Sequence, residues 1–407
     1  MTGDVSKLAD GGRVDALVCD SNGRVRDVLS CFGIGDEIIV LVIYENMVDT
    51  RSLLTAGIPW NKDLVLYDGN DALRHFMIHG EEALELIKLL LKHKNVKIKY
   101  LCGNSSVGKK ISYFDSNLNK KKLPKIIKFK KELLNDVDVV FTALPNGESQ
   151  KISKKLLKNN ILIDLSADFR LRKAKDFFKW YKIKHQAKYM IKKSIYALPE
   201  IKKNLIKNYK IISCPGCYPT SILLPLIPLI KDNLIKNKNI IIDSKSGYSG
   251  AGRGVHKKYR NRNLYESLSA YGISIHRHNS EIQQELNNYA KKNIKFNFTP
   301  HLSPMFRGIL STIYIDLKSN SSIKKIISLL KYTYRKDQFI KILKPNTFIS
   351  TNDVINTNNC FISVCKSKLK NKIIILSAID NLIKGGAGQA IQNMNILKNF
   401  PKKEGLS

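Results

Sequence analysis

The sequence predicts an α/β protein, with a doubly wound parallel sheet followed by a second, α+β domain. Two observations predict this fold class. Short apolar runs, including residues 137–143 and 161–165, alternate with segments of helical periodicity, which is typical of parallel strands connected by helices. The runs end in polar turns, at residues 102–106, 144–147 and 166–168, and the carboxyl ends of such strands are where open α/β sheets bind ligands.

The composition is that of a soluble globular protein. The 407 residues suffice for two or three domains, and 43% are hydrophobic and 25% charged. No apolar run is long enough to span a bilayer, and the N-terminus lacks the basic start and apolar core of a signal peptide. Seven cysteines at irregular spacings do not form a disulfide framework. We therefore expect a cytoplasmic protein without a membrane partner.

The net charge of +35 is unevenly distributed. Residues 1–80 hold 7 Lys and Arg against 12 Asp and Glu, net −5, whereas residues 81–407 hold 62 against 22, net +40. Beyond residue 80 lysines occur in every kind of segment, and no basic patch interleaved with aromatic residues stands out. This pattern favours a compositional bias over specific nucleic-acid binding.

Residues 1–83 form a separate, strand-rich segment. Two turn signals, at 20–23 and 33–36, separate apolar runs, and the first contains Asn-Gly, a strong hairpin signal. The order of strands and turns resembles a fragment of the folate-binding aminomethyltransferase superfamily, of the glycine-cleavage T-protein type. The fragment is too short for a complete folate pocket, so the resemblance implies no functional residue here.

The next segment, residues 84–216, alternates helix and strand. We expect a helix at 84–93 and strands at 96–101, 137–143 and 161–165. A dinucleotide site requires a first strand and a glycine-rich turn before the first helix, because a Cβ blocks the approach of backbone N–H groups to a pyrophosphate.

Only Gly80 is available for that turn, and Glu81 and Glu82 at the helix start would repel an anion. The sequence therefore predicts that the first strand and the glycine loop are replaced.

The segment Ser213–Thr220 reads as the end of a strand, a Pro-Gly turn and the start of a helix. Cys217 would then lie at a helix N-terminus, where unpaired N–H groups favour a thiolate. Cys214 and Cys217 also form a C-x-x-C pair, which is found in redox dithiols and zinc sites. No second pair completes four zinc ligands, so we expect no metal. From this segment alone, nucleophile, redox dithiol and buried structural thiol all remain open.

Polar, glycine-containing turns recur through the rest of the chain, at residues 244–253, 271–282, 301–308 and 380–390, the last before a helix at 391–398. Taken in order with Ser213–Thr220, these motifs make residues 84–407 similar to the N-acetyl-γ-glutamyl-phosphate reductases of arginine biosynthesis. Their fold is shared with aspartate-semialdehyde and glyceraldehyde-phosphate dehydrogenases.

The resemblance implies an oxidoreductase that reduces N-acetyl-γ-glutamyl phosphate with NADPH to N-acetylglutamate semialdehyde and phosphate. It implies Cys217 as nucleophile through a thioester and His276 as acid–base, with His278 as the alternative. The implied substrate-binding residues are Arg253, Arg277, His278 and Arg307. The implied cofactor-binding residues are Gly80, Ser105, Ser106, Lys109, Asn381, Gly385 and Gly388.

The resemblance also implies the domain organisation. An NADP-binding, Rossmann-like domain would span 84–216 and 373–407. A catalytic and dimerisation domain would span 217–372, with an antiparallel sheet suited to a homo-oligomer, a dimer or tetramer. Asn146 stands where the family usually has His, and Ser280 where it usually has Pro. Because residues 1–83 replace the glycine loop, the alternative is a non-catalytic or defective homologue that cannot bind NADPH.

Overall fold

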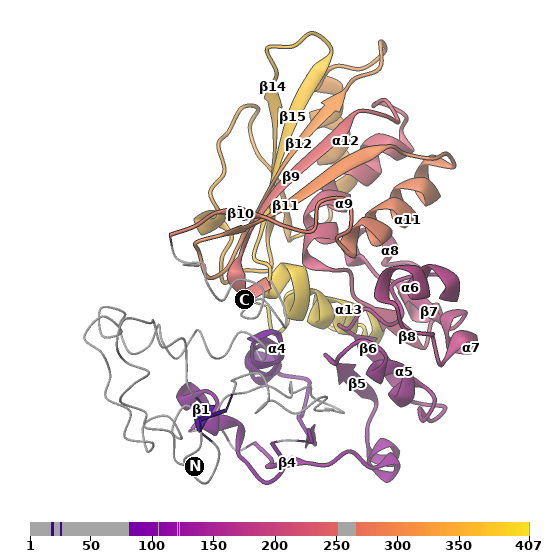
Figure 1. Cartoon of the computed structure of the whole chain (residues 1–407), viewed down its shortest axis with the longest axis vertical. Coiled ribbons are helices and arrows are strands. Elements are labelled where there is room, and N and C mark those ends of the chain that lie inside the picture. Colours follow the sequence, from indigo (N-terminus) through magenta and orange to yellow (C-terminus); the bar gives the residue numbers. More distant parts are fainter. Residues whose placement is uncertain are drawn as a thin grey trace.

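The computed structural model describes residues 18–19, 25–26, 81–104, 106–119, 121, 123–250 and 266–406. Figure 1 shows two halves, a lower one built on short strands and an upper one built on a large sheet. The hairpin predicted around residues 20–23 is present as β1 (Val18–Cys19) paired antiparallel with β2 (Val25–Arg26). The rest of the expected strand-rich segment lies outside the described residues.

The lower half contains the predicted parallel sheet. Four short strands, all parallel, run in the order β5-β6-β8-β7. They are β5 (Val139–Thr142), β6 (Ile161–Asp164), β8 (Ile211–Ser213) and β7 (Ser194–Tyr196). Every residue of β5 and β8 is buried, because helices cover both faces of such a sheet.

A second parallel pair lies beside this sheet. It consists of β3 (Leu101–Cys102) and β4 (Ile126–Ile127), so the strand expected at 96–101 is shorter and lies nearer its polar turn. Within the described residues no strand joins β3 to β5. The first strand of a doubly wound sheet belongs at this position. The residues expected to replace that strand lie outside the described part, so their replacement stays a prediction.

The first predicted helix is α4 (Glu81–Lys92), whose Leu84, Ile87 and other apolar residues at helical spacing are buried. Four shorter α-helices follow in the lower half: α5 (Glu148–Ser153), α6 (Ala174–Tyr181), α7 (Lys188–Ile191) and α8 (Pro199–Lys202). Short 3₁₀ turns occupy Ile111–Tyr113, Ser116–Leu118, Lys131–Asp136, Ile206–Asn208, Tyr248–Gly250 and Thr351–Asp353.

The upper half holds a seven-stranded sheet in the order β10-β11-β9-β12-β15-β14-β13. Its strands are β10 (Ser269–Ala270), β11 (Phe296–Ser303), β9 (Ile240–Gly247), β12 (Ile309–Asp316), β15 (Lys372–Ile379), β14 (Cys360–Lys366) and β13 (Ile340–Ile342). The expectation of an antiparallel sheet is wrong at two places, since β9–β11 and β13–β14 are parallel. The chain passes from β9 to β11 through α11 (His278–Ala290), and a helical crossover returns a strand in the same direction.

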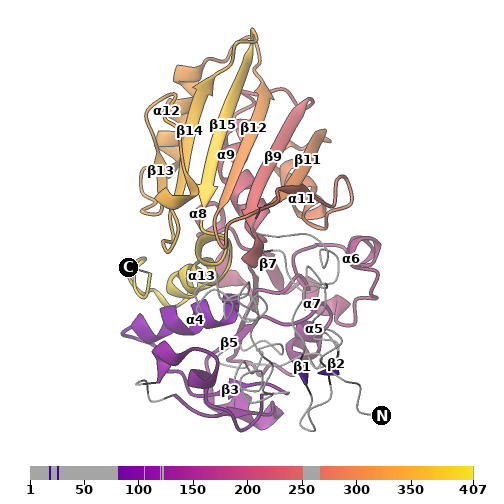
Figure 2. The same cartoon turned by 60° about the vertical axis from the view of Figure 1, so that its left-hand side comes forward.

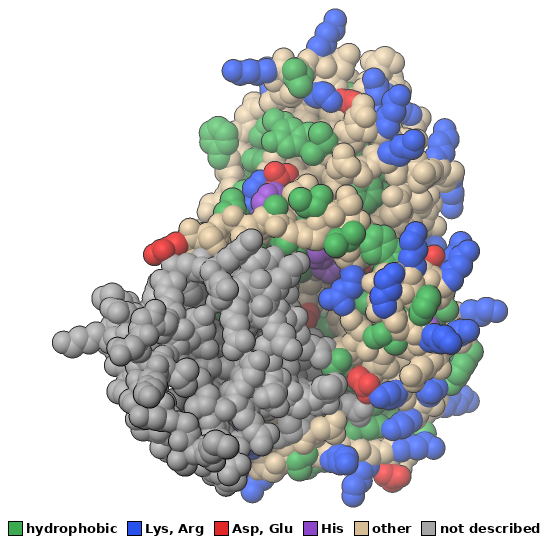
Figure 3. Space-filling model, in the orientation of Figure 1, with side chains coloured by type: hydrophobic (Ala, Val, Ile, Leu, Met, Phe, Trp, Pro, Cys, Tyr) green, Lys and Arg blue, Asp and Glu red, His purple; other side chains and the backbone are tan. Residues whose placement is uncertain are grey.

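Helices cover one face of this sheet. They are α9 (Cys217–Lys231), α11 and α12 (Ile323–Tyr334), which lie behind the strands in Figure 2. On the other face Ile241 and Tyr314 are 47% and 39% exposed, while their neighbours along each strand are buried. Apolar side chains gather on the upper half of the molecule in Figure 3. Among the described residues no helix covers this second face of the upper sheet, which is called the uncovered face below.

The end of the chain returns to the lower half. After β15, a π-helix (Ile383–Ala387, labelled η8) leads into α13 (Gly388–Lys398), which packs beside α4 (Figure 1). The return begins after Ile379 and not at residue 373 as expected, because β15 pairs with β12 and β14 of the upper sheet. No described helix is both long and apolar enough to cross a membrane.

Candidate active site

Cys217 lies where the sequence predicts it. Strand β8 ends at Ser213, Gly216 caps the next helix, and Cys217 is the first residue of α9. Its side chain is partly accessible, whereas Cys214 is buried, and both thiols are free.

The helix start does not make Cys217 a thiolate on its own. Burial, then the nearby Glu82 carboxyl, raise the pKa of the Cys217 thiol to about 12, and a hydrogen bond from the Tyr218 N–H offsets this only in part. The helix N-terminus alone therefore does not favour the thiolate, and loss of the thiol proton needs an acceptor.

Two histidines lie beside this turn. The His276 and His278 rings are 4.7 Å apart, and the Tyr218 ring is 5.6 Å from His276 and 5.9 Å from His278. The His278 ring also lies directly against Gly216, the residue before Cys217. Burial, then the neighbouring His278 and Arg277, lower the pKa of His276 to about 2, and burial lowers that of His278 well below its usual range. Both rings are therefore neutral, and a proton taken up by either ring would have to be stabilised by a nearby negative charge.

The two rings have different surroundings. His276 is enclosed by the rings of Tyr218, Tyr271 and Phe298, and its Nδ1 accepts a hydrogen bond from the backbone N–H of His278 at 3.1 Å. The Nδ1 of His278 is buried and has no hydrogen-bond partner among the described residues. Of the pair, His278 lies directly against Gly216 through its Nε2, and its buried, unpartnered Nδ1 is the other ring nitrogen.

A buried carboxylate, Glu281, holds this turn in place. It accepts hydrogen bonds from the Gly216 N–H at 3.0 Å, the Tyr196 hydroxyl at 3.1 Å and Arg170 Nη1 at 3.0 Å. Its side chain is completely buried, and His278 Nε2 lies 3.8 Å away. Sequence reasoning missed Glu281 and Arg170. The only sequence signal was the position of Glu281 one helical turn after His278, on the same face as that histidine.

The arginines expected to bind substrate are placed differently. The exposed Arg277 lies over the Tyr181 ring, with its guanidinium 5.3 Å from the ring centre. Arg307 is mostly buried and pairs with Glu85 at 3.1 Å and Asp380 at 3.3 Å. Its charge is balanced by two carboxylates, so Arg307 joins α4 to the segment after β15 instead of presenting a free cation. Arg253 lies outside the described residues.

Two of the expected cofactor residues follow β3. Ser106 is 2% exposed, and its carbonyl accepts a hydrogen bond from the Lys109 N–H at 3.1 Å. The Lys109 ammonium lies over the Tyr113 ring, 4.4 Å from its centre. Gly80 and Ser105 lie outside the described residues.

The other expected cofactor residues pack against protein. Asn381 accepts a hydrogen bond from the Gly308 N–H at 2.6 Å and donates one to Ser249 at 2.9 Å. A Cβ on Gly385 would lie 2.6 Å from the Cβ of Cys217. A Cβ on Gly388 would lie 2.6 Å from the Ile383 side chain. In this structure Gly385 therefore lies directly against the candidate nucleophile.

The turns after β5 and β6 lie on the same sheet edge as the Cys217 turn. Gly147 has a φ of 98° and begins α5, and Asp168 accepts hydrogen bonds from the Gly147 N–H at 2.6 Å and the Gln150 N–H at 3.1 Å. Burial and the nearby Asp164 raise the pKa of Asp168 to about 7. Of these two turns only the one after β5 contains a glycine, and the carboxyl ends of such strands are where open α/β sheets bind dinucleotides.

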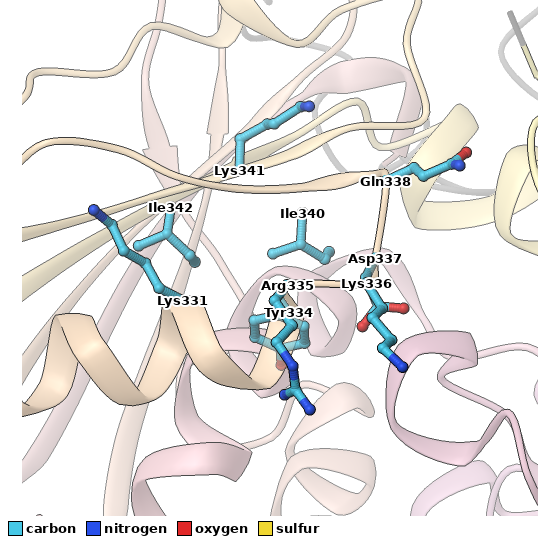
Figure 4. A pocket seen from close by; sticks show the side chains of 9 residues that line it. All are labelled: Lys331, Tyr334, Arg335, Lys336, Asp337, Gln338, Ile340, Lys341 and Ile342. Atoms are coloured by element: carbon cyan, nitrogen blue, oxygen red, sulfur yellow. The ribbon is translucent and has the colours of Figure 1, made fainter.

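A separate pocket lies far from this edge, between α12 and the edge strand β13 (Figure 4). It is lined by Lys331, Tyr334, Arg335, Lys336, Asp337, Gln338, Ile340, Lys341 and Ile342. None of the candidate site residues lines it. In the described ranges no group of three or more His, Cys, Asp or Glu side chains is arranged to hold a metal ion.

Two protein-family models match the chain. Residues 79–209 match the NAD-binding domain of semialdehyde dehydrogenases, and residues 217–381 match their dimerisation domain. Of the N-terminal segment they cover only residues 79–83, and its resemblance to aminomethyltransferases stays a prediction.

The curated relatives are similar over most of their length. An N-acetyl-gamma-glutamyl-phosphate reductase of Desulforamulus reducens is 38% identical over 336 residues, which is 80% of this chain and 95% of the relative. That of Brachyspira hyodysenteriae is 43% identical over 337 residues, 81% of this chain and 96% of the relative. A probable chloroplastic reductase of Arabidopsis thaliana is 39% identical over 80% of this chain and 82% of the relative.

Solved structures confirm the fold class. Aspartate semialdehyde dehydrogenase of Candida albicans, solved with NADP, has a TM-score of 0.57 at 18% identity and covers 79% of this chain and 96% of its own. Aspartate semialdehyde dehydrogenase II of Vibrio cholerae also has a TM-score of 0.57, at 15% identity, covering 78% of this chain and 95% of its own. At these identities the likeness concerns the fold alone.

Proposed function

The chain belongs to the N-acetyl-gamma-glutamyl-phosphate reductase family, and we propose that Cys217 is the nucleophile with which it converts N-acetyl-γ-glutamyl phosphate to N-acetylglutamate semialdehyde and phosphate. It is an NADP-dependent oxidoreductase. One observation carries the proposal: Cys217 begins a helix beside two neutral histidines, on a turn fixed by a buried carboxylate. No feature of the described residues favours the defective alternative.

The reaction begins at the thiol. The Cys217 sulfur attacks the acyl carbon, a carbon–sulfur bond forms, the bond to the phosphate oxygen breaks, and phosphate leaves with the electron pair. The backbone N–H groups at the start of α9 are suited to the oxygen that becomes negative during this attack. NADPH, when bound, supplies the hydride that reduces the resulting thioester. Collapse of the reduced adduct then releases the aldehyde and returns the thiol.

The thiol proton needs an acceptor, because burial keeps Cys217 protonated. We assign this role to His278, since its Nε2 lies directly against Gly216, the residue before Cys217, and 3.8 Å from the Glu281 carboxylate. His276, the residue favoured by the sequence, then orients this region through its aromatic surroundings and its hydrogen bond to the His278 backbone. A cation formed on His278 would be stabilised by the adjacent Glu281 carboxylate.

Arg277 is the arginine best suited to bind the anionic substrate. Its guanidinium is exposed, stacks over Tyr181 and has no carboxylate partner among the described residues, and Arg277 stands between the two histidines in sequence. A planar guanidinium matches carboxylate and phosphate groups. The turns that contain Ser106, Lys109 and Gly147 lie at strand ends, where NADPH would bind. The roles of Ser105 and Gly80 in cofactor binding and of Arg253 in substrate binding stay predictions.

The dimerisation domain is consistent with a homo-oligomer. We assign the contact to the uncovered face of the upper sheet, where Ile241 and Tyr314 are exposed. The cytoplasmic location and the domain boundaries 84–216, 217–372 and 373–407 stay predictions. The exception is β15, which pairs with strands of the upper sheet and does not belong to the cofactor domain.

The test compares two cysteines in the purified full chain. Cys217→Ser is expected to lower the rate of NADPH oxidation by about a thousandfold or more, since a covalent step is lost. The matched control, Cys214→Ser, changes the buried thiol three residues before Cys217 (217 − 214) and is expected to retain activity. Equal loss from both variants would support a dithiol oxidoreductase and overturn the proposal. A fluorescence titration of full-length protein with NADPH, expected to saturate at micromolar concentrations, tests the defective alternative directly.

A further inference from the structure

The segment after β15 contacts the Cys217 turn with one face. Gly385 lies against Cys217, the Gln389 amide donates a hydrogen bond to Thr220 at 3.2 Å, and the Asn393 amide contacts the Cys214 sulfur at 3.7 Å. These three residues are spaced by four, so they lie along one side of the helical segment. Thr220 in turn donates to the Gly216 carbonyl at 2.9 Å. The segment therefore forms the backing of the nucleophile turn.

The other side of the same segment holds a buried ion pair. The Lys384 ammonium donates to Glu200 of α8 at 2.5 Å, and both side chains are completely buried. Gln392 completes the cluster, donating to Glu200 at 2.7 Å and accepting from Lys384 at 2.8 Å. A buried ion pair is often no more stable than well-packed apolar residues of the same volume, so stability alone does not explain it.

The backbone here is a π-helix. The Gly385 N–H donates to the Asp380 carbonyl at 2.9 Å, and the Ala387 N–H to the Leu382 carbonyl at 2.8 Å, both five residues back. This wide turn places a residue without a side chain at Cys217. A Cβ on Gly385 would lie 2.6 Å from the Cys217 Cβ and 3.0 Å from its Cα. If the segment rotated by one residue, the neighbouring Lys384 or Gly386 would face the nucleophile instead.

We propose that Lys384 and Glu200 are positioning residues for Cys217. Their ion pair sets the rotation of the π-helix about its own axis, and that rotation presents Gly385 to the nucleophile. Neither residue touches the reacting atoms. This inference rests on the proposed role of Cys217 and goes beyond it, since it assigns the buried pair a task in reactivity and not only in stability.

The experiment separates positioning from stability. Three variants of the full chain are compared, Lys384→Met, Glu200→Gln and the double variant Lys384→Met/Glu200→Leu. The rate of Cys217 alkylation by iodoacetamide is measured across pH by peptide mass spectrometry, beside the melting temperature and the NADPH dissociation constant. Each single variant leaves a buried charge without its counter-ion, so it is expected to lose both melting temperature and alkylation rate.

The double variant decides the question. With an apolar pair its melting temperature is expected to return close to that of the natural protein. Alkylation of Cys217 is expected to stay about tenfold or more slower, with a shifted pH profile, because the backing has rotated. NADPH binding is expected to be unchanged. Alkylation at the natural rate in the double variant would overturn the proposal, since the pair would then be structural only.

Two further variants keep the test decisive if the double variant does not fold. Gly385→Ala retains the ion pair but introduces a Cβ that clashes with Cys217. If Cys217 of this variant were alkylated at the natural rate, the proposal would also be overturned. Lys372→Met removes an ion pair with Asp316 in the upper sheet and is expected to leave alkylation unchanged. Full activity of Cys217→Ser would instead contradict the proposed function, so the two failures can be told apart.

Discussion

The two sheets of the molecule expose different parts of themselves. In β5 of the lower sheet every residue is buried, whereas β12 of the upper sheet alternates between buried and accessible residues. A parallel sheet covered on both faces is accessible only at its strand ends, while a sheet covered on one face also offers a surface. This difference supports the two proposals above, chemistry at the ends of the lower strands and subunit contact on the face of the upper sheet.

A substitution of Glu281 tests this division most strongly. This residue of the upper half accepts hydrogen bonds from Gly216 and Arg170 of the lower half. Glu281→Gln leaves Arg170 buried without a negative partner, so we expect a loss of about 3 kcal/mol in the free energy of unfolding. The displaced turn is expected to lower kcat by about a hundredfold. Denaturant unfolding and steady-state kinetics measure the two effects.

A neighbouring carboxylate provides the control. Glu285 lies one turn further along α11, is equally buried and pairs with Arg172 at 3.3 Å, but it does not bond to Gly216. Glu285→Gln is expected to lower stability without the loss in kcat. The same loss in kcat from both variants would show that stability, and not the position of the turn, explains the effect.

Replacing the histidines sharpens the description of the lower strand ends. We expect His278→Ala to lower kcat/KM by about a hundredfold to ten-thousandfold, as removal of a proton acceptor does, and His276→Ala to have a smaller effect. The pH dependence of kcat/KM checks the assignment. His93→Ala, whose ring bonds to Asn395 far from Cys217, is expected to leave that profile unchanged. A larger loss from His276→Ala would restore the assignment made from sequence.

Substitutions on the uncovered face of the upper sheet test the other side of the comparison. Tyr314→Asp places a charge on that face, and we expect the homo-oligomer to dissociate. The rate of Cys217 alkylation is expected to change less than in the variants at the lower strand ends. Sedimentation measures the mass. Tyr332→Asp, on the helical side and 65% exposed, is the matched control. An unchanged mass for Tyr314→Asp would place the subunit contact elsewhere.

The smallest expected effect concerns pH. Burial raises the pKa of Glu82 from 4.5 to about 7, with Arg170 opposing and Asp164 adding to the shift. Between these two pH values the folded chain binds more protons than the unfolded one, so this carboxyl stabilises the fold at low pH and stabilises it less as pH rises through 7. We expect the melting temperature to fall between pH 5 and pH 8, by less in Glu82→Gln. An equal fall in the variant would assign the effect to another group.

The sequence predicted the local features of this fold better than its long-range contacts. Apolar runs gave β5 and β6, and the Pro-Gly turn correctly placed Cys217 at the first residue of α9. The parallel β9–β11 pair was missed because alternation of apolar residues specifies a half-buried strand but not the direction of its neighbour.

The site shows the same limit. His276 and His278 were found from a local motif, but the bond from Glu281 to Gly216 joins residues 65 positions apart. The role of Arg307 depends on Glu85 and Asp380, which come from two distant segments. Charges buried by long-range contacts cannot be distinguished from surface charges by their sequence neighbours.

The return of residues 383–398 to the lower half has a consequence for synthesis. Cys217 and its helix leave the ribosome long before the π-helix that backs them, so a nascent chain carries the nucleophile without Gly385 against it. Gly385 follows Cys217 by 168 positions (385 − 217), so the contact between the two residues cannot form while that stretch is being synthesised. Until then the Cys217 turn lacks this support.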